Sequence, residues 1–268
     1  MAALPDIQAL IQANDLAGAI ATVKAAIRKA AAEPDLRFLL FQLASLAGDW
    51  TSAANQLSAY SELTGRQSPL PVVFRRLVAA EVEREKVFAG EAAPLIFGEP
   101  SPWIAPLVQA LEAVARRDFA AAMDLRSRAL AQAAPCAGSI NGQPFDWLMD
   151  GDSRLGPVLE AVVNGSYYWI PLERIRSLSC EPPSQLRDAV WTAGTLKLAT
   201  GADVPAFIPA RYPGVQSWAD GSLKMARSTD WDCPVEGCYL GRGQRMLLTQ
   251  DSEVSLLDLR LLEFTASP

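Results

Sequence analysis

The apolar residues of the first seventy positions recur three and four residues apart, the spacing of helices with one buried face. We expect four helices between residues 5 and 64. Asp15 caps the second, Pro34 opens the third and Trp50 opens the fourth, while Gly48 and Gly65 end the last two. The apolar stripes of the second and third helices are Leu16, Ala19, Ile20, Val23 and Ile27, and Leu36, Leu39, Leu40, Leu43 and Ala47.

The same pattern returns after 34 residues. The turn Asn14-Asp15-Leu16 is in register with Gly48-Asp49-Trp50, and Ala19 is in register with Ala53. Thirty-four residues is the period of the tetratricopeptide repeat (TPR), a helix–turn–helix unit that buries its apolar faces by stacking. Stacked units leave a concave surface that holds a peptide or a helix. We therefore expect the front half to be a binding scaffold.

The 35–47 helix carries the first candidate peptide-binding residues. Phe38, Gln42 and Ser45 lie on the side opposite the leucine stripe. A phenylalanine among polar neighbours suits a groove that recognises an amphipathic helix. Packing of Phe38 against a neighbouring repeat is the alternative.

The helical pattern continues with an interruption. Ser68-Pro-Leu-Pro71 breaks the chain before a charged helix at 72–88, and a Pro- and Gly-rich loop follows at 90–102. A second helical pair is expected at 103–116 and 119–133. Because Ala122 lies 69 residues after Ala53, two periods plus one, the segment between them occupies the place of an interrupted repeat.

From Pro135 onward, short β-prone runs alternate with turn clusters. The runs are Tyr167–Ile170, Ala206–Ile208, Arg245–Thr249 and Val254–Leu259, and one helix is expected at 154–163. The predicted fold class is α+β: N-terminal TPR-like α-helical repeats followed by a mainly β C-terminal domain. The predicted domains are residues 1–134 and 135–268.

Composition narrows the function. The chain has no histidine and a formal net charge of −6. The missing histidine removes the commonest general base and metal ligand. The negative net charge disfavours binding to nucleic acid and to anionic membrane surfaces. We expect a protein that is not an enzyme. The rival is a carboxylate-based hydrolase using Asp150, Asp152 or Asp230, with carboxylates about 5–10 Å apart in a pocket; otherwise these three residues should be exposed turn caps.

No cofactor or metal is expected. Cys233 and Cys238 are close, but they lack a second pair, so free thiols are predicted for all four cysteines. The start at Met1 shows no signal peptide, and no apolar run reaches the ~20 residues of a membrane span. We expect a cytoplasmic protein.

Three neighbouring aromatic residues form a second candidate binding cluster. Tyr167, Tyr168 and Trp169 follow one another in a β-prone run. Tyrosine and tryptophan dominate binding hot spots, so Tyr168 and Trp169 are candidate peptide-binding residues. In an alternating strand, one or two of the three should instead face a core.

The C-terminal half carries an ordered series of motifs. They are Gly138-Ser-Ile-Asn-Gly-Gln-Pro-Phe145, Asp150-Gly-Asp-Ser-Arg-Leu-Gly-Pro-Val-Leu-Glu160, Gly165-Ser-Tyr-Tyr-Trp-Ile-Pro171, Leu186-Arg-Asp-Ala-Val-Trp191, Pro209-Ala-Arg-Tyr212, Thr229-Asp-Trp231, Gly241-Arg-Gly-Gln-Arg245 and Leu257-Asp-Leu-Arg260. In this series the chain resembles the ImpE family, also called TagJ, accessory proteins of bacterial type VI secretion.

The resemblance implies a non-enzymatic adaptor. Such proteins associate with the contractile sheath through a helix of its small subunit, and they are linked to the ClpV AAA+ ATPase that disassembles contracted sheath. No catalytic residues come with the family. The motif residues Arg154, Trp169, Arg187, Tyr212, Trp231 and Arg245 either hold the fold or form an interface. A homodimeric assembly protein is the third possibility.

Overall fold

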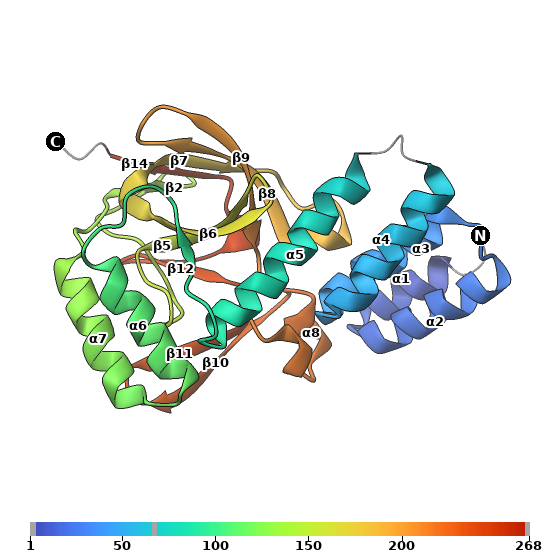
Figure 1. Ribbon diagram of the computed structural model, residues 1–268, viewed down its shortest axis with the longest axis horizontal. Helices are drawn as coiled ribbons and strands as arrows, with labels where there is room; N and C mark the ends of the chain where they lie inside the picture. The colour runs from blue at the N-terminus through green and yellow to red at the C-terminus, as the bar shows by residue number, and fades with distance from the viewer. Residues whose placement is uncertain (1–3, 66–68, 266–268) are drawn as a thin grey trace.

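The computed structural model describes residues 4–65 and 69–265 (Figure 1). Helices come first and strands follow, which confirms the α+β class. Ser68, where a chain break was predicted, and Met1 lie outside the described residues. The long helices are α1 (Leu4–Gln12), α2 (Leu16–Lys29), α3 (Pro34–Ala47), α4 (Trp50–Thr64), α5 (Leu70–Phe88), α6 (Ile104–Ala115) and α7 (Phe119–Gln132).

The helical hairpins share one local turn. Two residues before each second helix the backbone is left-handed, with φ of 60° at Asn14, 73° at Gly48 and 62° at Arg117. An aspartate follows each time, and its side chain accepts a hydrogen bond from the backbone three residues on. Four residues after each aspartate stands a buried alanine, which lets the two helices approach closely. The predicted repeat is therefore present, with a third copy in α6 and α7.

The strands form one large sheet and two small ones. The nine-stranded sheet has the order β1-β6-β5-β9-β8-β7-β14-β2-β3, and all neighbours are antiparallel except β1 and β6. Its strands are β1 (Leu95–Ile96), β2 (Gly138–Ile140), β3 (Gln143–Phe145), β5 (Val158–Val163), β6 (Ser166–Pro171), β7 (Ile175–Cys180), β8 (Trp191–Leu198), β9 (Asp203–Pro209) and β14 (Leu261–Phe264).

The smaller sheets border the large one. One pairs β10 (Thr229–Val235) with β11 (Cys238–Gly243), and the other has the order β13-β12-β4, from Glu253–Ser255, Met246–Leu248 and Met149–Asp150. A short helix, α8 (Gly221–Lys224), precedes β10. The β-prone runs at 167–170, 206–208 and 245–249 lie in or overlap β6, β9 and β12. The fourth run, Val254–Leu259, is only in part a strand, because a 3₁₀ turn begins at Leu256.

The helix predicted at 154–163 is wrong, because this segment contains β5. All six residues of β5 are buried. Val158 and Val162 face the core shared with the helices, whereas Leu159, Ala161 and Val163 face a second core. A strand buried on both faces loses the alternation of apolar and polar residues, so its sequence resembles a buried helix.

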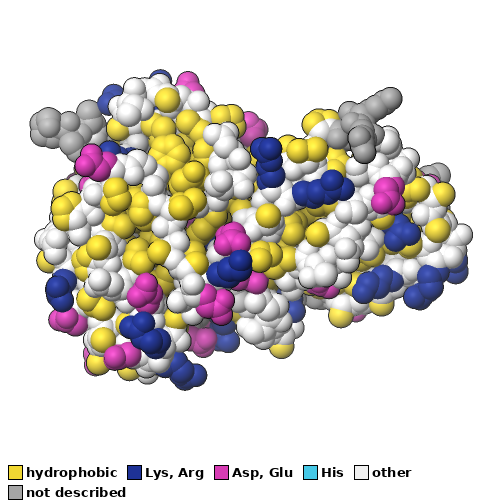
Figure 2. Space-filling model, in the orientation of Figure 1, with side chains coloured by type: hydrophobic (Ala, Val, Ile, Leu, Met, Phe, Trp, Pro, Cys, Tyr) yellow, Lys and Arg dark blue, Asp and Glu magenta, His cyan; other side chains and the backbone are white. Residues whose placement is uncertain are grey.

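Two lobes are visible in Figures 1 and 2. The narrower lobe contains α1–α4, and the broader lobe contains the sheets with α6 and α7 beside them, while α5 runs between the two. One apolar core extends from Ile7 in α1 to Trp191 in β8. The last long helix ends at Gln132 and β2 begins at Gly138, but β1 and this core cross the expected boundary at residue 134, so the division into two domains stays a prediction. None of the described helices is long and apolar enough to cross a membrane.

Candidate functional site

Two arginines of the C-terminal half hold the ends of the N-terminal helices. The Nη1 of Arg227 donates to the carbonyl of Ile11, at 2.8 Å, and to the side chain of Asn14, at 2.7 Å. The Nη1 of Arg211 donates to the carbonyl of Leu46, at 2.6 Å. The last carbonyls of a helix lack intrahelical partners and attract cations. The C-terminal ends of α1 and α3 are thereby held against residues 211–227.

Between β7 and β8 the chain leaves the sheet and lies across α3. We call this segment, residues 181–190, the strap. It contains a 3₁₀ turn over Leu186–Ala189. The guanidinium carbon of Arg187 lies 5.6 Å from the ring centroid of Phe38 and 4.9 Å from that of Phe74. The backbone N–H of Arg187 donates to the side-chain oxygen of Gln42, at 3.3 Å. The strap thus contacts both α3 and α5.

A groove stays open beside the strap, with a volume of about 510 Å³. We call it the docking groove. Its apolar residues come from three elements, and polar side chains are interspersed with them. No aspartate or glutamate is among its lining residues, which are Leu39, Gln42 and Leu46 of α3, Pro183, Ser184, Gln185, Leu186 and Ala189 of the strap, and Met225 and Arg227 after α8. Apolar anchors interspersed with polar groups are typical of surfaces that hold an amphipathic helix.

The structure places the predicted residues of α3 at or under this groove. Gln42 lines it. Phe38 is half-buried under Arg187, in an aromatic cluster with Phe41, Tyr60 and Phe74. Ser45 is fully buried, and its hydroxyl donates to the carbonyl of Phe41, at 2.9 Å. Peptide binding by these residues stays a prediction, and Ser45 offers no surface for it.

The predicted residues of β6 lie elsewhere. Trp169 is fully buried, and its Nε1 donates to the hydroxyl of Tyr167, at 2.8 Å. Tyr168 is half-buried on the other face of the strand, edge-on to Phe97 at 5.4 Å between ring centroids. The structure therefore does not bring Tyr168 and Trp169 together with the α3 residues. Sequence reasoning missed the strap, Met225 and Arg227; the only signal was the motif from Leu186 to Trp191.

A buried charge network lies beneath the junction of α5 and the sheet. Arg84 of α5 donates from Nε and Nη2 to the carboxylate of Glu160 in β5, at 2.6 and 3.0 Å. Arg245 contacts the same carboxylate at 3.2 Å and Asp150 at 2.7 Å. Burial by itself would raise the pKa of Glu160, but the nearby charges of Arg84 and Arg245 lower it to about 2. Glu160 is therefore ionised and fully paired.

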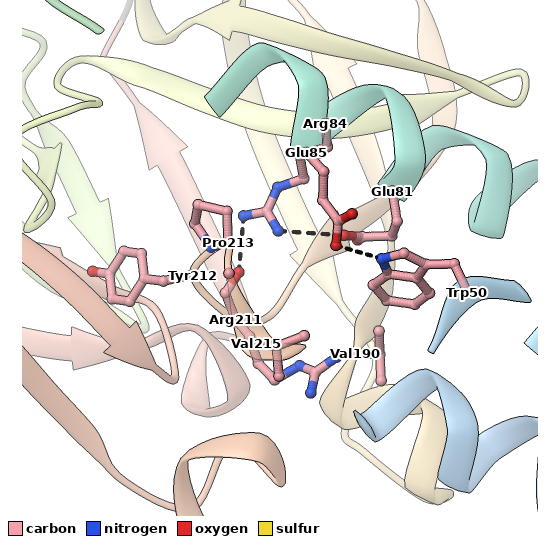
Figure 3. A pocket seen from close by; sticks show the side chains of 10 residues that line it. Trp50, Glu81, Arg84, Glu85, Val190, Arg211, Tyr212, Pro213 and Val215 are labelled. Atoms are coloured by element: carbon pink, nitrogen blue, oxygen red, sulfur yellow. Dashed lines mark hydrogen bonds and ion pairs between the residues drawn. The ribbon is translucent and has the colours of Figure 1, made fainter. Parts of the chain in front are cut away.

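The pocket beside this network is too small for a substrate. Glu81, Arg84 and Glu85 of α5 converge there with Trp50 and Arg211 (Figure 3). Its volume is about 10 Å³, the space of a single water molecule. Burial raises the pKa of Glu81, and the charges of Arg84 and Arg211 oppose that rise. A ligand cannot reach these groups, so the network acts as a structural tie between α5 and the sheet.

The expectation that Asp150 and Asp152 are exposed turn caps is wrong. Both are buried, with exposures of 1% and 0%. Arg245 binds Asp150, whereas Asp152 accepts bonds from the Arg154 guanidinium, at 2.9 and 2.5 Å, and from the backbone N–H of Gly241. The partners of these turn residues lie up to 95 positions away, which local sequence does not reveal. Asp230, by contrast, is exposed and pairs with Arg242 at 2.7 Å.

Several residues of the motif series belong to this network. Arg154, Tyr212 and Arg245 are in its hydrogen bonds or packed beside it, and none is surface-exposed.

Among the described residues, no group of three or more histidine, cysteine, aspartate or glutamate side chains is arranged to hold a metal ion. The four cysteines are free thiols.

The fold is thus a TPR-like helical scaffold in which α1, α3 and α5 are tied to a β lobe. Residues 142–263 match the family model described as ImpE protein. Over 258 residues the chain is 40% identical to the type VI secretion system accessory component TagJ of Pseudomonas aeruginosa, covering 95% of this chain and 89% of that protein. The chain therefore belongs to the ImpE/TagJ family of type VI secretion accessory proteins.

A solved structure has the same fold. The crystal structure of protein VPA1032 from Vibrio parahaemolyticus superposes with a TM-score of 0.89 and covers 97% of each chain. The sequence identity is 24%. Both the helical scaffold and the β lobe are therefore shared with that protein.

Proposed function

We propose that this protein is a cytoplasmic, non-enzymatic adaptor of the type VI secretion system. It binds an amphipathic helix of the contractile sheath's small subunit and links the sheath to recycling by a ClpV-type AAA+ ATPase. The accessory role follows from the relative TagJ. The helix-binding role is supported by one observation above others, the docking groove on α3.

The chemistry of the groove favours a helix as its occupant. Leu39 of α3 and Met225 after α8 offer apolar contacts that do not depend on the strap, and Leu186 adds a third contact while the strap is in place. An amphipathic helix presents apolar side chains at positions i, i+3 or i+4, and i+7, which can meet such contacts together. The polar groups of the groove include the exposed Gln185, which can bond with a docked helix, and the buried Gln42, whose side-chain oxygen accepts from Arg187 of the strap.

The carboxylates support binding over catalysis. A carboxylate-based hydrolase needs an accessible pair of carboxyl groups, one of them with a free proton-transfer position. Asp150 and Asp152 are buried in pairs with Arg245 and Arg154. Asp230 stands apart on the exposed β10–β11 hairpin, paired with Arg242.

Calorimetric titration of the purified protein with the sheath small subunit tests the proposal. We expect a dissociation constant of tens of micromolar or tighter, roughly −6 kcal/mol or better. Leu39→Glu places a charge on the groove and should weaken binding at least tenfold, roughly 1.4 kcal/mol. Leu95→Glu, at an exposed leucine of β1, is the matched control and should bind like the wild type. Absence of binding, or equal effects of the two variants, would refute the proposal.

A further inference from the structure

We propose that the strap is an intramolecular ligand of the helix-docking face, which the partner helix displaces when it binds. This inference rests on the proposed function and describes how the same site is regulated. Three features of residues 181–190 support it: the place of the strap on the helices, the way its ends are tied, and its loose packing.

The strap lies where a peptide ligand would lie. α3 and α5 are the first helices of successive repeat positions, and such helices line the concave face of a repeat scaffold. Arg187 reaches between them and covers the rings of Phe38 and Phe74. Its backbone N–H is bonded to Gln42. A cation over aromatic rings and a backbone-to-side-chain bond are contacts that a bound peptide also makes.

The two ends of the strap are anchored, one in the sheet and the other in the core. Cys180 pairs with Gly194 in the β7–β8 ladder, and the N–H of Glu181 donates to the carbonyl of Ala193, at 3.0 Å. Trp191, at the far end, is buried with 1% exposure, stacked on Phe41 of α3 and bonded to Glu81 of α5. Residues 181–189 can therefore leave α3 while Val190, Trp191 and the β7–β8 ladder stay in place.

The strap also keeps its own shape. One carboxylate oxygen of Asp188 accepts bonds from the backbone N–H groups of Ser184 and Gln185, both at 2.8 Å. The Nη1 of Arg187 donates to the side chain of Gln185, at 2.6 Å. These bonds lie within the strap, so it can move as a preformed unit.

Packing is loose under the first half of the strap, whereas Leu186 and Ala189 pack against the core and Val190 is buried in it. The docking groove, of about 510 Å³, lies on one side, and a second pocket, of about 170 Å³, lies on the other. Residues 181–185 are exposed. The buried hydroxyl of Thr192, which lines the second pocket, has no hydrogen-bond partner among the described residues. An element with few buried contacts and empty space beside it opens more readily than the core around it.

If the partner helix displaces the strap, weakening the contacts of the strap should increase the affinity for the partner. If the strap covers the site, only the open fraction binds, and the apparent affinity falls by that fraction. Arg187→Ala removes both aromatic contacts of the strap and should tighten binding of the sheath small subunit roughly three- to tenfold. Arg176→Ala, an exposed arginine of β7 outside the groove, should leave the affinity unchanged.

Hydrogen exchange and calorimetry on the full chain test the inference together. On addition of the sheath small subunit, we expect faster amide exchange in residues 186–190 and slower exchange in α3. Slower exchange in the strap, or an Arg187→Ala protein that is folded and binds no more tightly than the wild type, would overturn displacement and make the strap a fixed wall of the groove. Failure of the proposed function has another signature, since neither protein would then bind.

Discussion

Arg84→Met tests the buried tie between the helices and the sheet. In the wild type the guanidinium makes two bonds to Glu160 and one to the carbonyl of Arg211, at 2.8 Å, and it lies 3.4 Å from Glu81. Methionine fills similar space but leaves these acceptors without their donor. Glu160 keeps Arg245 and Tyr167, whereas Glu81 keeps the indole N–H of Trp191.

The magnitude follows from burial. The side chains of Arg84 and Glu160 are 4% and 0% exposed, so water does not replace the lost bonds. Removing one partner of a buried ion pair costs about 3–5 kcal/mol. For a chain of this size, about 2–4 °C per kcal/mol gives a fall in Tm of roughly 6–20 °C.

Thermal and urea unfolding of Arg84→Met and of a matched control provide the measurement. Lys86→Met lies two residues further along α5 and removes an ion pair to Glu83 whose side chains are 47% and 58% exposed. Exposed pairs contribute about 0–1 kcal/mol, so this variant should unfold close to the wild type. Equal stability of the two variants, or a more stable Arg84→Met protein, would show that apolar packing replaces the network at no loss.

Three further predictions concern the buried network, a turn between helices and the cap of α1. The pKa of Glu160 is about 2 in the folded protein, below its ordinary value of 4.5, so its stabilising contribution is complete above pH 4.5 and is lost as the pH falls toward 2. The stability difference between the wild type and Glu160→Gln should therefore shrink from pH 7 to pH 3. A constant difference would contradict this. Gly48→Ala should cost about 1–3 kcal/mol of unfolding free energy, because φ is +73° and the new Cβ would lie 2.4 Å from Val215, whereas Gly142→Ala, at φ +81° with open space, should cost less. Arg227→Ala should speed amide exchange at the C-terminal end of α1 and leave α3 unchanged, because only α1 loses its cap.

The helical repeat could be derived from sequence because its signals are local. A residue able to adopt a left-handed backbone, an aspartate and an alanine four positions later stand within six residues of one another at Asn14, Gly48 and Arg117. Turn geometry and helix capping depend on such close neighbours. The positions of the seven long helices followed from these signals and the apolar spacing.

The strand β5 and the burial of Asp150 and Asp152 could not be predicted from local sequence. β5 is central in the sheet and buried on both faces, so its apolar run carries no alternation to distinguish it from a helix. Asp150-Gly-Asp152 has the composition of an exposed turn. Its burial depends on Arg245 and on the β10–β11 hairpin, which the chain supplies about ninety residues later.

The amino-acid sequence alone determined the class of scaffold, the repeat, the helical and strand-rich halves and the family, since each is written in short-range periodicity or in an ordered series of motifs. Tertiary structure decided which face of the scaffold is open. Folding brings the strap onto Phe38 and Phe74, sets Arg211 and Arg227 at the helix ends and leaves the groove between α3 and residues 183–189. These contacts join residues more than one hundred positions apart, and their geometry depends on packing of the whole chain.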